Sequence, residues 1–109
     1  MMDEQEFRKR ADDAMTDLAH RLASASDTHQ FESDFGAGAL AIEFEDPPGK
    51  FVISPNTPVR QIWVSAHSKS FKLDWDPSRG AFVLAATGQT LAEMIADVVG
   101  QQLGEEVVL

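Results

Sequence analysis

The chain of 109 residues has the length of one domain, taken to span residues 1–109, and its 43% hydrophobic and 25% charged residues are typical of a globular protein. It contains no cysteine, which excludes disulfides, thiolate zinc sites and thiolate-ligated iron–sulfur clusters. Eighteen acidic against nine basic residues give a net charge of −9, which disfavours nucleic acids and anionic membranes as partners and favours metal ions or basic protein surfaces.

The first ten residues, MMDEQEFRKR, contain no apolar segment of the kind found in signal peptides, and their acidic residues are untypical of transit peptides. No apolar run approaches the roughly 20 residues that a membrane-spanning helix needs. We therefore expect a soluble, cytoplasmic protein.

An amphipathic helix is predicted from Asp3 to about Ala25, because apolar residues recur there at three- and four-residue spacing. Acidic residues in its first turns favour the helix dipole. The stripe expected to face the core comprises Phe7, Ala11, Ala14, Leu18 and Leu22. The following stretch, SASDTHQ, has no such period and ends the helix.

Strands are predicted wherever apolar residues alternate or form short runs, at residues 39–45, 50–54, 59–66, 70–75 and 81–86. The segment DPPG (residues 46–49) is predicted to be a turn, because a proline cannot donate a hydrogen bond to a sheet. The short connections between these runs favour antiparallel pairing.

A second helix is predicted to begin at Thr90, which forms a capping-box pattern with Glu93, and to end at Gly104. The tail EEVVL is apolar enough to lie along the core. These elements predict an α+β fold, a two-layer α-β sandwich in which an antiparallel sheet of about five to six strands carries the N- and C-terminal helices on one face. The apolar stripe of the second helix comprises Leu91, Met94, Ile95 and Val98.

Trp63 is a large aromatic residue in the middle of the predicted strand 59–66. Ile62 and Val64 share one face of that strand, and Trp63 has the opposite parity. If the helices cover Ile62 and Val64, Trp63 points to the uncovered face, where polar neighbours would give it the composition of an interaction hot spot. The alternative is that Trp63 caps a local hydrophobic cluster over Phe51 or Phe71.

A stripe of ionisable residues runs along one face of the first predicted helix: Glu6, Asp13, Asp17 and His20. Carboxylate and imidazole groups suit iron. Asp13 and Asp17 lie four residues apart and repel each other, so that a cation between them would relieve the repulsion. The alternative is an ordinary solvated helix face, which composition alone favours.

Catalytic patterns are not found in the sequence. Acids on an exposed helix supply neither the cleft nor the raised pKa that glycosidase chemistry needs, and the three histidines accompany no nucleophile motif.

Four segments make the chain similar to the frataxin family, whose bacterial members are called CyaY. The most specific is VISPNTPVRQIWVSA (52–66), a strand and a proline-containing turn followed by Gln-Ile-Trp. The others are DFGAGALAIEFE (34–45), KLDW (72–75) and GQTLAEM (88–94). The likeness runs in order over essentially the whole chain.

The resemblance implies a compact α-β sandwich that is not an enzyme and that binds iron, as Fe2+ or Fe3+, weakly at surface carboxylates. It also implies docking on the cysteine desulfurase and scaffold protein that build iron–sulfur clusters, as a regulator and iron donor. The matching Gln61 and Trp63 are then expected to contact that complex. Residues expected to extend this surface are Asn56, Arg60 and Lys72.

Relatives crowd acidic residues at the end of the first helix and the start of the first strand, where this chain has alanines and serines among fewer acids. We therefore expect weaker or differently placed iron binding than in acid-rich relatives. The candidate iron ligands are Asp13, Asp17, His20, Asp27, His29, Glu32 and Asp34.

Two other functions are left open by the sequence. One is an iron-detoxifying oligomer with ferroxidase activity, which needs carboxylates clustered at bridging distance. The other is an acidic protein-interaction module that does not bind metal. We expect a monomer, and the sequence leaves iron-dependent oligomers and weak ferroxidase activity open.

Overall fold

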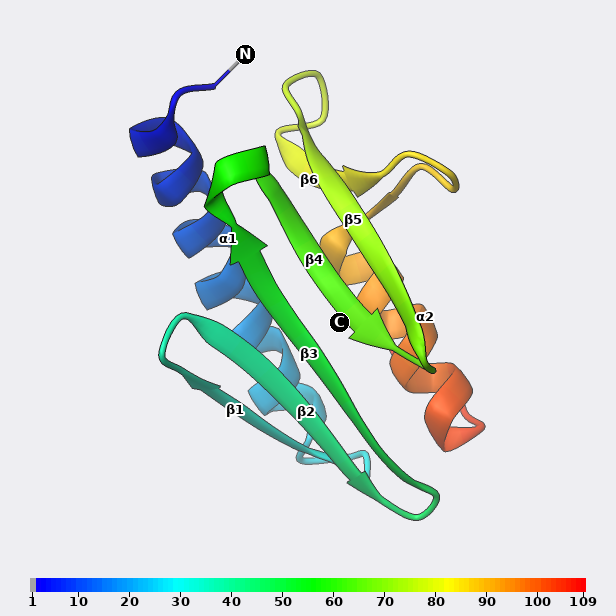
Figure 1. Ribbon diagram of the computed structural model, residues 1–109. Helices are drawn as coiled ribbons and strands as arrows, with labels where there is room; N and C mark the ends of the chain where they lie inside the picture. Colours follow the sequence, from blue (N-terminus) through cyan, green and yellow to red (C-terminus); the bar gives the residue numbers. More distant parts are fainter. Residues whose placement is uncertain (1) are drawn as a thin grey trace.

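Figure 1 shows the computed structural model, which describes residues 2–109. Helix α1 (Glu4–Ala25) precedes a sheet of seven strands, and helix α2 (Leu91–Leu103) follows it. The strands are β1 (Glu32–Gly36), β2 (Ala39–Glu45), β3 (Pro48–Asn56), β4 (Gln61–Ala66), β5 (Lys69–Asp76), β6 (Ala81–Leu84) and β7 (Gln89–Thr90), with a 3-10 helix η1 (Thr57–Val59) between β3 and β4.

The strands pair in chain order, and every neighbouring pair is antiparallel. Both helices lie behind the sheet in Figure 1, so one face of the sheet is packed and the other, the outer face, points to solvent. The predicted α+β sandwich with two helices on one face is therefore confirmed.

The predicted number of strands, five to six, is too low. The prediction lacked β1 and β7. Strand β1 has the sequence ESDFG, which shows no apolar alternation and stays mostly exposed at the edge of the sheet. Strand β7 has two residues and ends at the cap of α2, so its pattern is too short to recognise.

Two strand boundaries also differ from the predicted ones. Strand β4 begins at Gln61, because the residues expected to start it form η1 and Arg60 adopts a left-handed conformation with φ of 56°. Strand β3 begins at Pro48, so the turn predicted over residues 46–49 is shorter than expected. Proline is tolerated there because the first position of a strand need not donate to the ladder.

Helix α1 begins where the side chain of Asp3 accepts a hydrogen bond of 2.8 Å from the backbone N–H of Glu6, which satisfies one of the free donors at the helix start. Its buried stripe contains Met15 in place of the predicted Ala14, which is half-buried. No helix in residues 2–109 is long and apolar enough to cross a membrane.

The core lies between the helices and the packed face of the sheet, and the buried side chains of residues 2–109 are all hydrophobic. Its largest fully buried members are Phe7, Phe51 and Phe82. The tail after α2 contributes Val107, which is 7% exposed, so the prediction that the tail lies along the core is confirmed.

Helix α2 has the predicted capping box between Thr90 and Glu93 and is capped at its C-terminal end by Gly104, whose φ of 69° requires a residue that tolerates the left-handed region. The backbone N–H groups of Gly104 and Glu105 both donate to the carbonyl of Gly100. The chain thereby folds back over the last turn of the helix and brings Val107 into the core.

Replacing Gly100 by alanine is expected to destabilise the protein by about 1–3 kcal/mol, although alanine favours a helix by about 1 kcal/mol over glycine. An added Cβ at Gly100 would lie 2.8 Å from the backbone oxygen of Glu105, which is a steric clash. The free energy of unfolding in urea measures the effect. The matched control is Gly36→Ala, where an added Cβ meets nothing within 4 Å. Equal stability of Gly100→Ala and wild type would contradict the expected clash.

Candidate functional site

Trp63 lies on the outer face of the sheet. Its side chain is 37% exposed, whereas its neighbours Ile62 and Val64 are 0% and 1% exposed beneath the helices. The alternative that Trp63 covers Phe51 or Phe71 is wrong, because both phenylalanines have the parity of the packed face: they pair across the sheet with Ile42 and Val64. The indole is therefore presented to solvent and not to a local hydrophobic cluster.

The Trp63 side chain is held by neighbours on β4 and β5. Its Nε1–H donates a hydrogen bond of 3.0 Å to Oε1 of Gln61, and the Nζ of Lys72 lies 4.9 Å from the centroid of the indole ring, a cation–π contact. The Nε2 of Gln61 in turn donates a hydrogen bond of 3.1 Å to Oδ1 of Asp74. We refer to Gln61, Trp63, Lys72 and Asp74 as the Trp63 cluster.

The turn between β4 and β5 determines which residue lies beside the indole. Only His67 and Ser68 connect the two strands, with φ of 52° and 61°, as a two-residue hairpin turn of type I′ requires. The resulting register places Trp63 opposite Lys72. A slip of one residue would turn Lys72 to the packed face, so this turn sets the composition of the Trp63 cluster.

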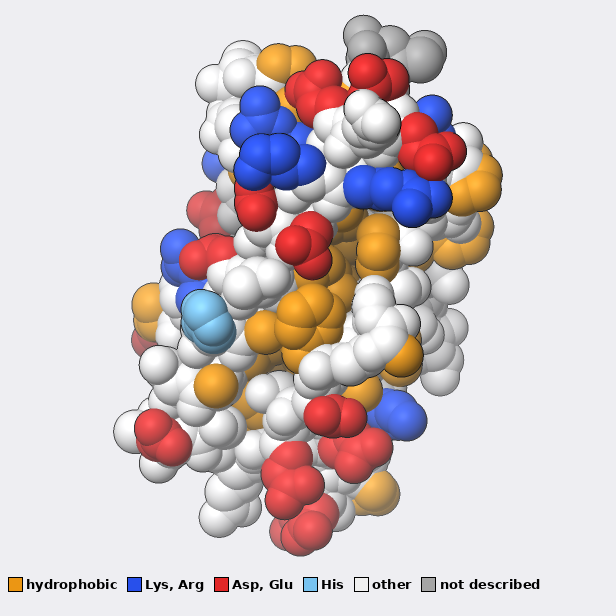
Figure 2. Space-filling model, turned by 90° about the vertical axis from the view of Figure 1, so that its left-hand side faces the viewer, with side chains coloured by type: hydrophobic (Ala, Val, Ile, Leu, Met, Phe, Trp, Pro, Cys, Tyr) orange, Lys and Arg blue, Asp and Glu red, His pale blue; other side chains and the backbone are white. Residues whose placement is uncertain are grey.

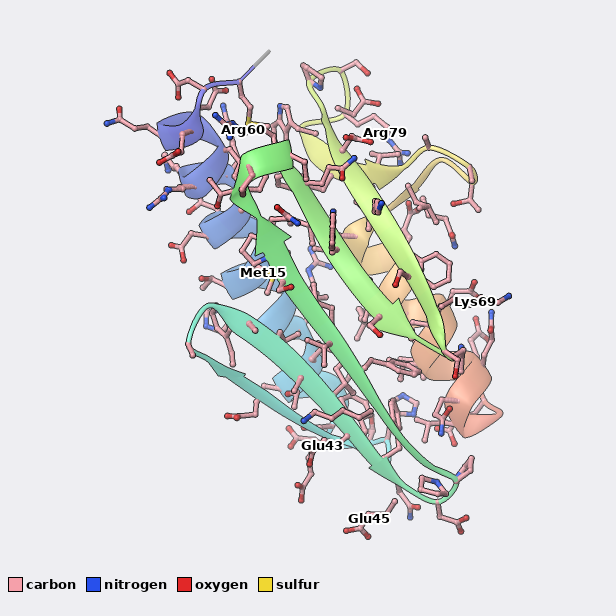
Figure 3. The ribbon with its side chains drawn as sticks, viewed as in Figure 1. Met15, Glu43, Glu45, Arg60, Lys69 and Arg79 are labelled. Atoms are coloured by element: carbon pink, nitrogen blue, oxygen red, sulfur yellow. The ribbon has the colours of Figure 1, made fainter. Side chains whose placement is uncertain are left out.

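Two further residues predicted for partner binding flank the connection between β3 and β4: Asn56 is the last residue of β3, and Arg60 lies between η1 and β4. Asn56 is opposite Gln61 in the β3–β4 register, which brings it beside the Trp63 cluster. Arg60 is half-buried next to η1, and its Nη1 donates to the backbone carbonyl of Thr57. Figure 3 shows Arg60 at the upper end of the molecule. It directly precedes Gln61 in the chain and therefore borders the cluster.

The outer face beside Trp63 is built from small side chains. The cross-strand partner of Trp63 on β3 is Ser54. The next row of the sheet consists of Ala41, Val52, Ser65 and Ser70. Because these side chains are shorter than an indole, a protein surface can reach Trp63, which is 37% exposed. Because it combines an aromatic anchor with polar neighbours, this face is suited to protein docking.

The acids predicted on α1 are paired with basic residues of the same helix. Asp13 Oδ2 lies 3.0 Å from Nζ of Lys9, and Asp17 Oδ2 lies 2.8 Å from Nε of Arg21. Each pair spans one helical turn, and exposed pairs of this kind contribute about 0–1 kcal/mol. The repulsion expected between Asp13 and Asp17 is thus already offset without a metal ion.

The remaining candidate ligands lie on the second half of α1, in the α1–β1 loop and on β1. His29 Nδ1 contacts Oε2 of Glu105 in the tail, a partner that the sequence did not indicate. Glu32 is opposite Glu43, which forms an ion pair of 3.6 Å with Lys50. His20, Asp27 and Asp34 are exposed.

Acidic residues also line a groove of about 490 Å³ at this end of the sheet. Figure 2 shows acidic side chains gathered at the lower end of the molecule, and Figure 3 places Glu43 and Glu45 there. The ionisable residues lining the groove are His29, Glu32, Glu43, Glu45 and Asp46.

Within residues 2–109, no three His, Asp or Glu side chains are placed so that they could hold one metal ion. The seven candidate ligands are thus spread over α1, the α1–β1 loop and β1. They therefore offer a cation only separate carboxylate and imidazole groups at the surface.

Within residues 2–109, the carboxylates of Asp76 and Glu93 have lowered pKa values, and both belong to local structure. The Ser78 hydroxyl donates to Asp76 and lowers the pKa of that carboxyl from its ordinary value of 3.8. The backbone N–H of Thr90 donates to Glu93 and lowers the pKa of Glu93 from 4.5. These groups stabilise the turn after β5 and the start of α2, respectively.

Comparison with known proteins gives consistent matches. The family model of the frataxin-like domain matches residues 1–105. A relative from Azotobacter vinelandii named iron–sulfur cluster assembly protein CyaY is 37% identical over 70 residues, which are 64% of this chain and 63% of that relative. A relative of the same name from Pseudomonas entomophila is 30% identical over 94 residues, 86% of this chain and 84% of the relative.

Solved structures give the same fold. A frataxin from Psychromonas ingrahamii superposes with a TM-score of 0.83 at 20% identity, covering 98% of this chain and 97% of the other. A trimeric yeast frataxin from Saccharomyces cerevisiae superposes with a TM-score of 0.73 at 23% identity, covering 88% and 80%. At these identities the likeness concerns the arrangement of helices and strands.

Proposed function

Since this chain belongs to the frataxin-like family, whose model matches residues 1–105, we propose that it acts in iron–sulfur cluster assembly by docking on the cysteine desulfurase–scaffold complex. Two relatives carry iron–sulfur cluster assembly in their names, which supports this process. The outer face of the sheet is the proposed docking surface, and regulation of the desulfurase is the proposed result.

The observation that carries the proposal is the exposed and fixed indole of Trp63. A side chain that folding alone required would be expected beneath the helices, yet Trp63 is 37% exposed and is held by Gln61 and Lys72. Fixing a large aromatic before binding lowers the entropy that is lost when the partner docks. Asn56 and Arg60 extend the proposed surface.

Electrostatics would guide the approach of a basic partner. The net charge of −9 and the acidic end of the molecule attract a positively charged surface over a distance of about 10 Å at ordinary ionic strength. The acidic residues would raise the association rate, and the Trp63 cluster would determine which partner binds.

Binding to the desulfurase complex is expected to weaken by roughly threefold or more when the salt concentration is raised from about 0.05 M to 0.5 M. Affinity and desulfurase turnover, measured with and without this protein across that range, test the proposed function. The double variant Glu32→Gln, Glu45→Gln should bind with a smaller salt dependence, and Trp63→Ala should keep the salt dependence at lower affinity. Absence of any complex, or a complex insensitive to salt, would contradict the proposal.

Iron is proposed to bind weakly and to be carried as cargo. The surface carboxylates have the oxygen ligands that iron accepts, but their separation within residues 2–109 argues against a tight preformed site. The same separation argues against a ferroxidase centre, which needs carboxylates at bridging distance.

An NMR titration with Fe2+ is expected to broaden signals locally around Glu32, Glu43 and the α1–β1 loop, because these acids share one groove. The signals of the Asp13 and Asp17 region should broaden less, since Lys9 and Arg21 already pair with those carboxylates. Titration with Mg2+ controls for general ionic effects. Unchanged spectra would favour the second candidate function, an acidic interaction module that does not bind metal. The ion pairs on α1 also support this candidate, because they occupy carboxylates that would otherwise be available to iron.

A further inference from the structure

A chain of side-chain hydrogen bonds runs across β4 and β5 toward the indole. Asp74 Oδ1 accepts from Gln61 Nε2 at 3.1 Å, and Gln61 Oε1 accepts from Trp63 Nε1 at 3.0 Å. Asp74 and Gln61 are opposite each other in the register, as are Lys72 and Trp63. The four side chains therefore form one continuous group on the outer face.

The hydrogen-bonding chemistry of Trp63 and Asp74 determines the orientation of the Gln61 side chain between them. An indole N–H can only donate, and an ionised carboxylate can only accept. The Gln61 carboxamide carries both functions, so only one of its two flipped orientations satisfies both neighbours. In the other orientation its NH2 would face the indole N–H and its oxygen would face the Asp74 carboxylate. Asp74 thus selects the orientation in which Gln61 can hold Trp63.

We propose that Asp74 is a positioning residue for docking: it orients Gln61, and through Gln61 it holds the indole of Trp63 in the conformation that meets the partner. This inference rests on the proposed function of the outer face. Lys72 holds the ring from its own position on β5, 4.9 Å from the centroid, so the indole is restrained at both its N–H edge and its face. Without Asp74 the carboxamide can rotate, and the order of the indole must then be gained during binding.

Three variants separate positioning from charge. Asp74→Ala removes the acceptor, whereas Asp74→Asn removes the charge, replaces one carboxylate oxygen by an NH2 group and retains a carbonyl oxygen that can accept from Gln61. Asp97→Asn removes one charge from an exposed position on α2, behind the sheet. We expect Asp74→Ala to bind the desulfurase complex about threefold to tenfold more weakly, and both asparagine variants to bind within about twofold of wild type. Equal weakening in Asp74→Ala and Asp74→Asn would overturn the proposal and make Asp74 a charge contact.

The free protein provides a second readout that does not depend on the partner. The chain has two tryptophans and therefore two indole N–H signals in an NMR spectrum, and Trp63→Phe assigns them. In Asp74→Ala the Trp63 indole N–H should exchange faster with solvent and lose its nuclear Overhauser contacts to the Gln61 side chain, while Asp74→Asn keeps both properties. An unchanged indole signal in Asp74→Ala would overturn the positioning role even if binding falls. If wild type forms no complex, the docking role fails with the proposed function, and the indole readout still decides whether Asp74 orients the cluster.

Discussion

Trp63→Ala is expected to weaken binding to the desulfurase complex by about 30-fold or more, which corresponds to about 2 kcal/mol. The change removes the aromatic anchor from the centre of the outer face, together with its hydrogen bond to Gln61 and its contact with Lys72. The affinity can be measured by calorimetry, and desulfurase turnover should lose its response to the protein in parallel.

The matched control is Phe35→Ala, which removes another exposed aromatic side chain, 40% exposed, from the edge strand β1. Phe35 is opposite Leu40 and has the parity of the packed face, so its loss should leave the affinity within about twofold. Both variants should keep the far-ultraviolet spectrum of the folded protein. If Trp63→Ala binds as well as Phe35→Ala, the outer face is not the docking surface.

Phe82→Ala is expected to destabilise the protein by about 3–5 kcal/mol, a large part of the 5–15 kcal/mol that keeps a typical domain folded. Phe82 is 1% exposed and joins the sheet to α1. Its ring centroid lies 5.9 Å from that of Phe7 and 5.2 Å from that of Trp75, both in edge-to-face geometry. Truncation is expected to leave a cavity between these two rings.

Urea unfolding measures the free energy that Phe82→Ala loses. The control is Phe35→Ala, which makes the same change at an exposed site. Phe35→Ala should cost less than about 1 kcal/mol. Similar losses in the two variants would mean that the Phe82 position collapses around the smaller side chain, contrary to the packing described above.

Hydrophobic periodicity predicted the elements that determine the architecture. The spacing of Phe7, Ala11, Leu18 and Leu22 located α1 and its buried face, and the parity of Trp63 against Ile62 placed the indole on the outer face. These features are local, because they depend only on which residues share one side of a helix or strand. Strand β1 was missed for the same reason: its sequence carries no such pattern, and its pairing with β2 comes from the fold.

The composition of the site depends on contacts between elements, and sequence spacing reveals these only in part. Asp74 shares the parity of Lys72, but its partner Gln61 follows from a register set by a His-Ser turn, which is not the usual Asn-Gly signal of such hairpins. The contact of His29 with Glu105 joins a loop to the tail, and no local pattern indicates it.

The ion pairs on α1 were visible in the sequence, since Lys9 and Asp13, like Asp17 and Arg21, are four residues apart. The acids alone suggest a stripe that a metal ion could bridge, whereas the acids together with their basic neighbours predict the ion pairs that the structure has.

Docking through the outer face of the sheet can be measured by NMR mapping of the isotope-labelled protein in complex with unlabelled desulfurase. We expect cross-saturation to attenuate the Trp63 indole N–H and the backbone signals of β3, β4 and β5 around Gln61 and Lys72, while signals of α2 stay intact. Attenuation confined to the helices, with the Trp63 indole unaffected, would place the docking surface elsewhere.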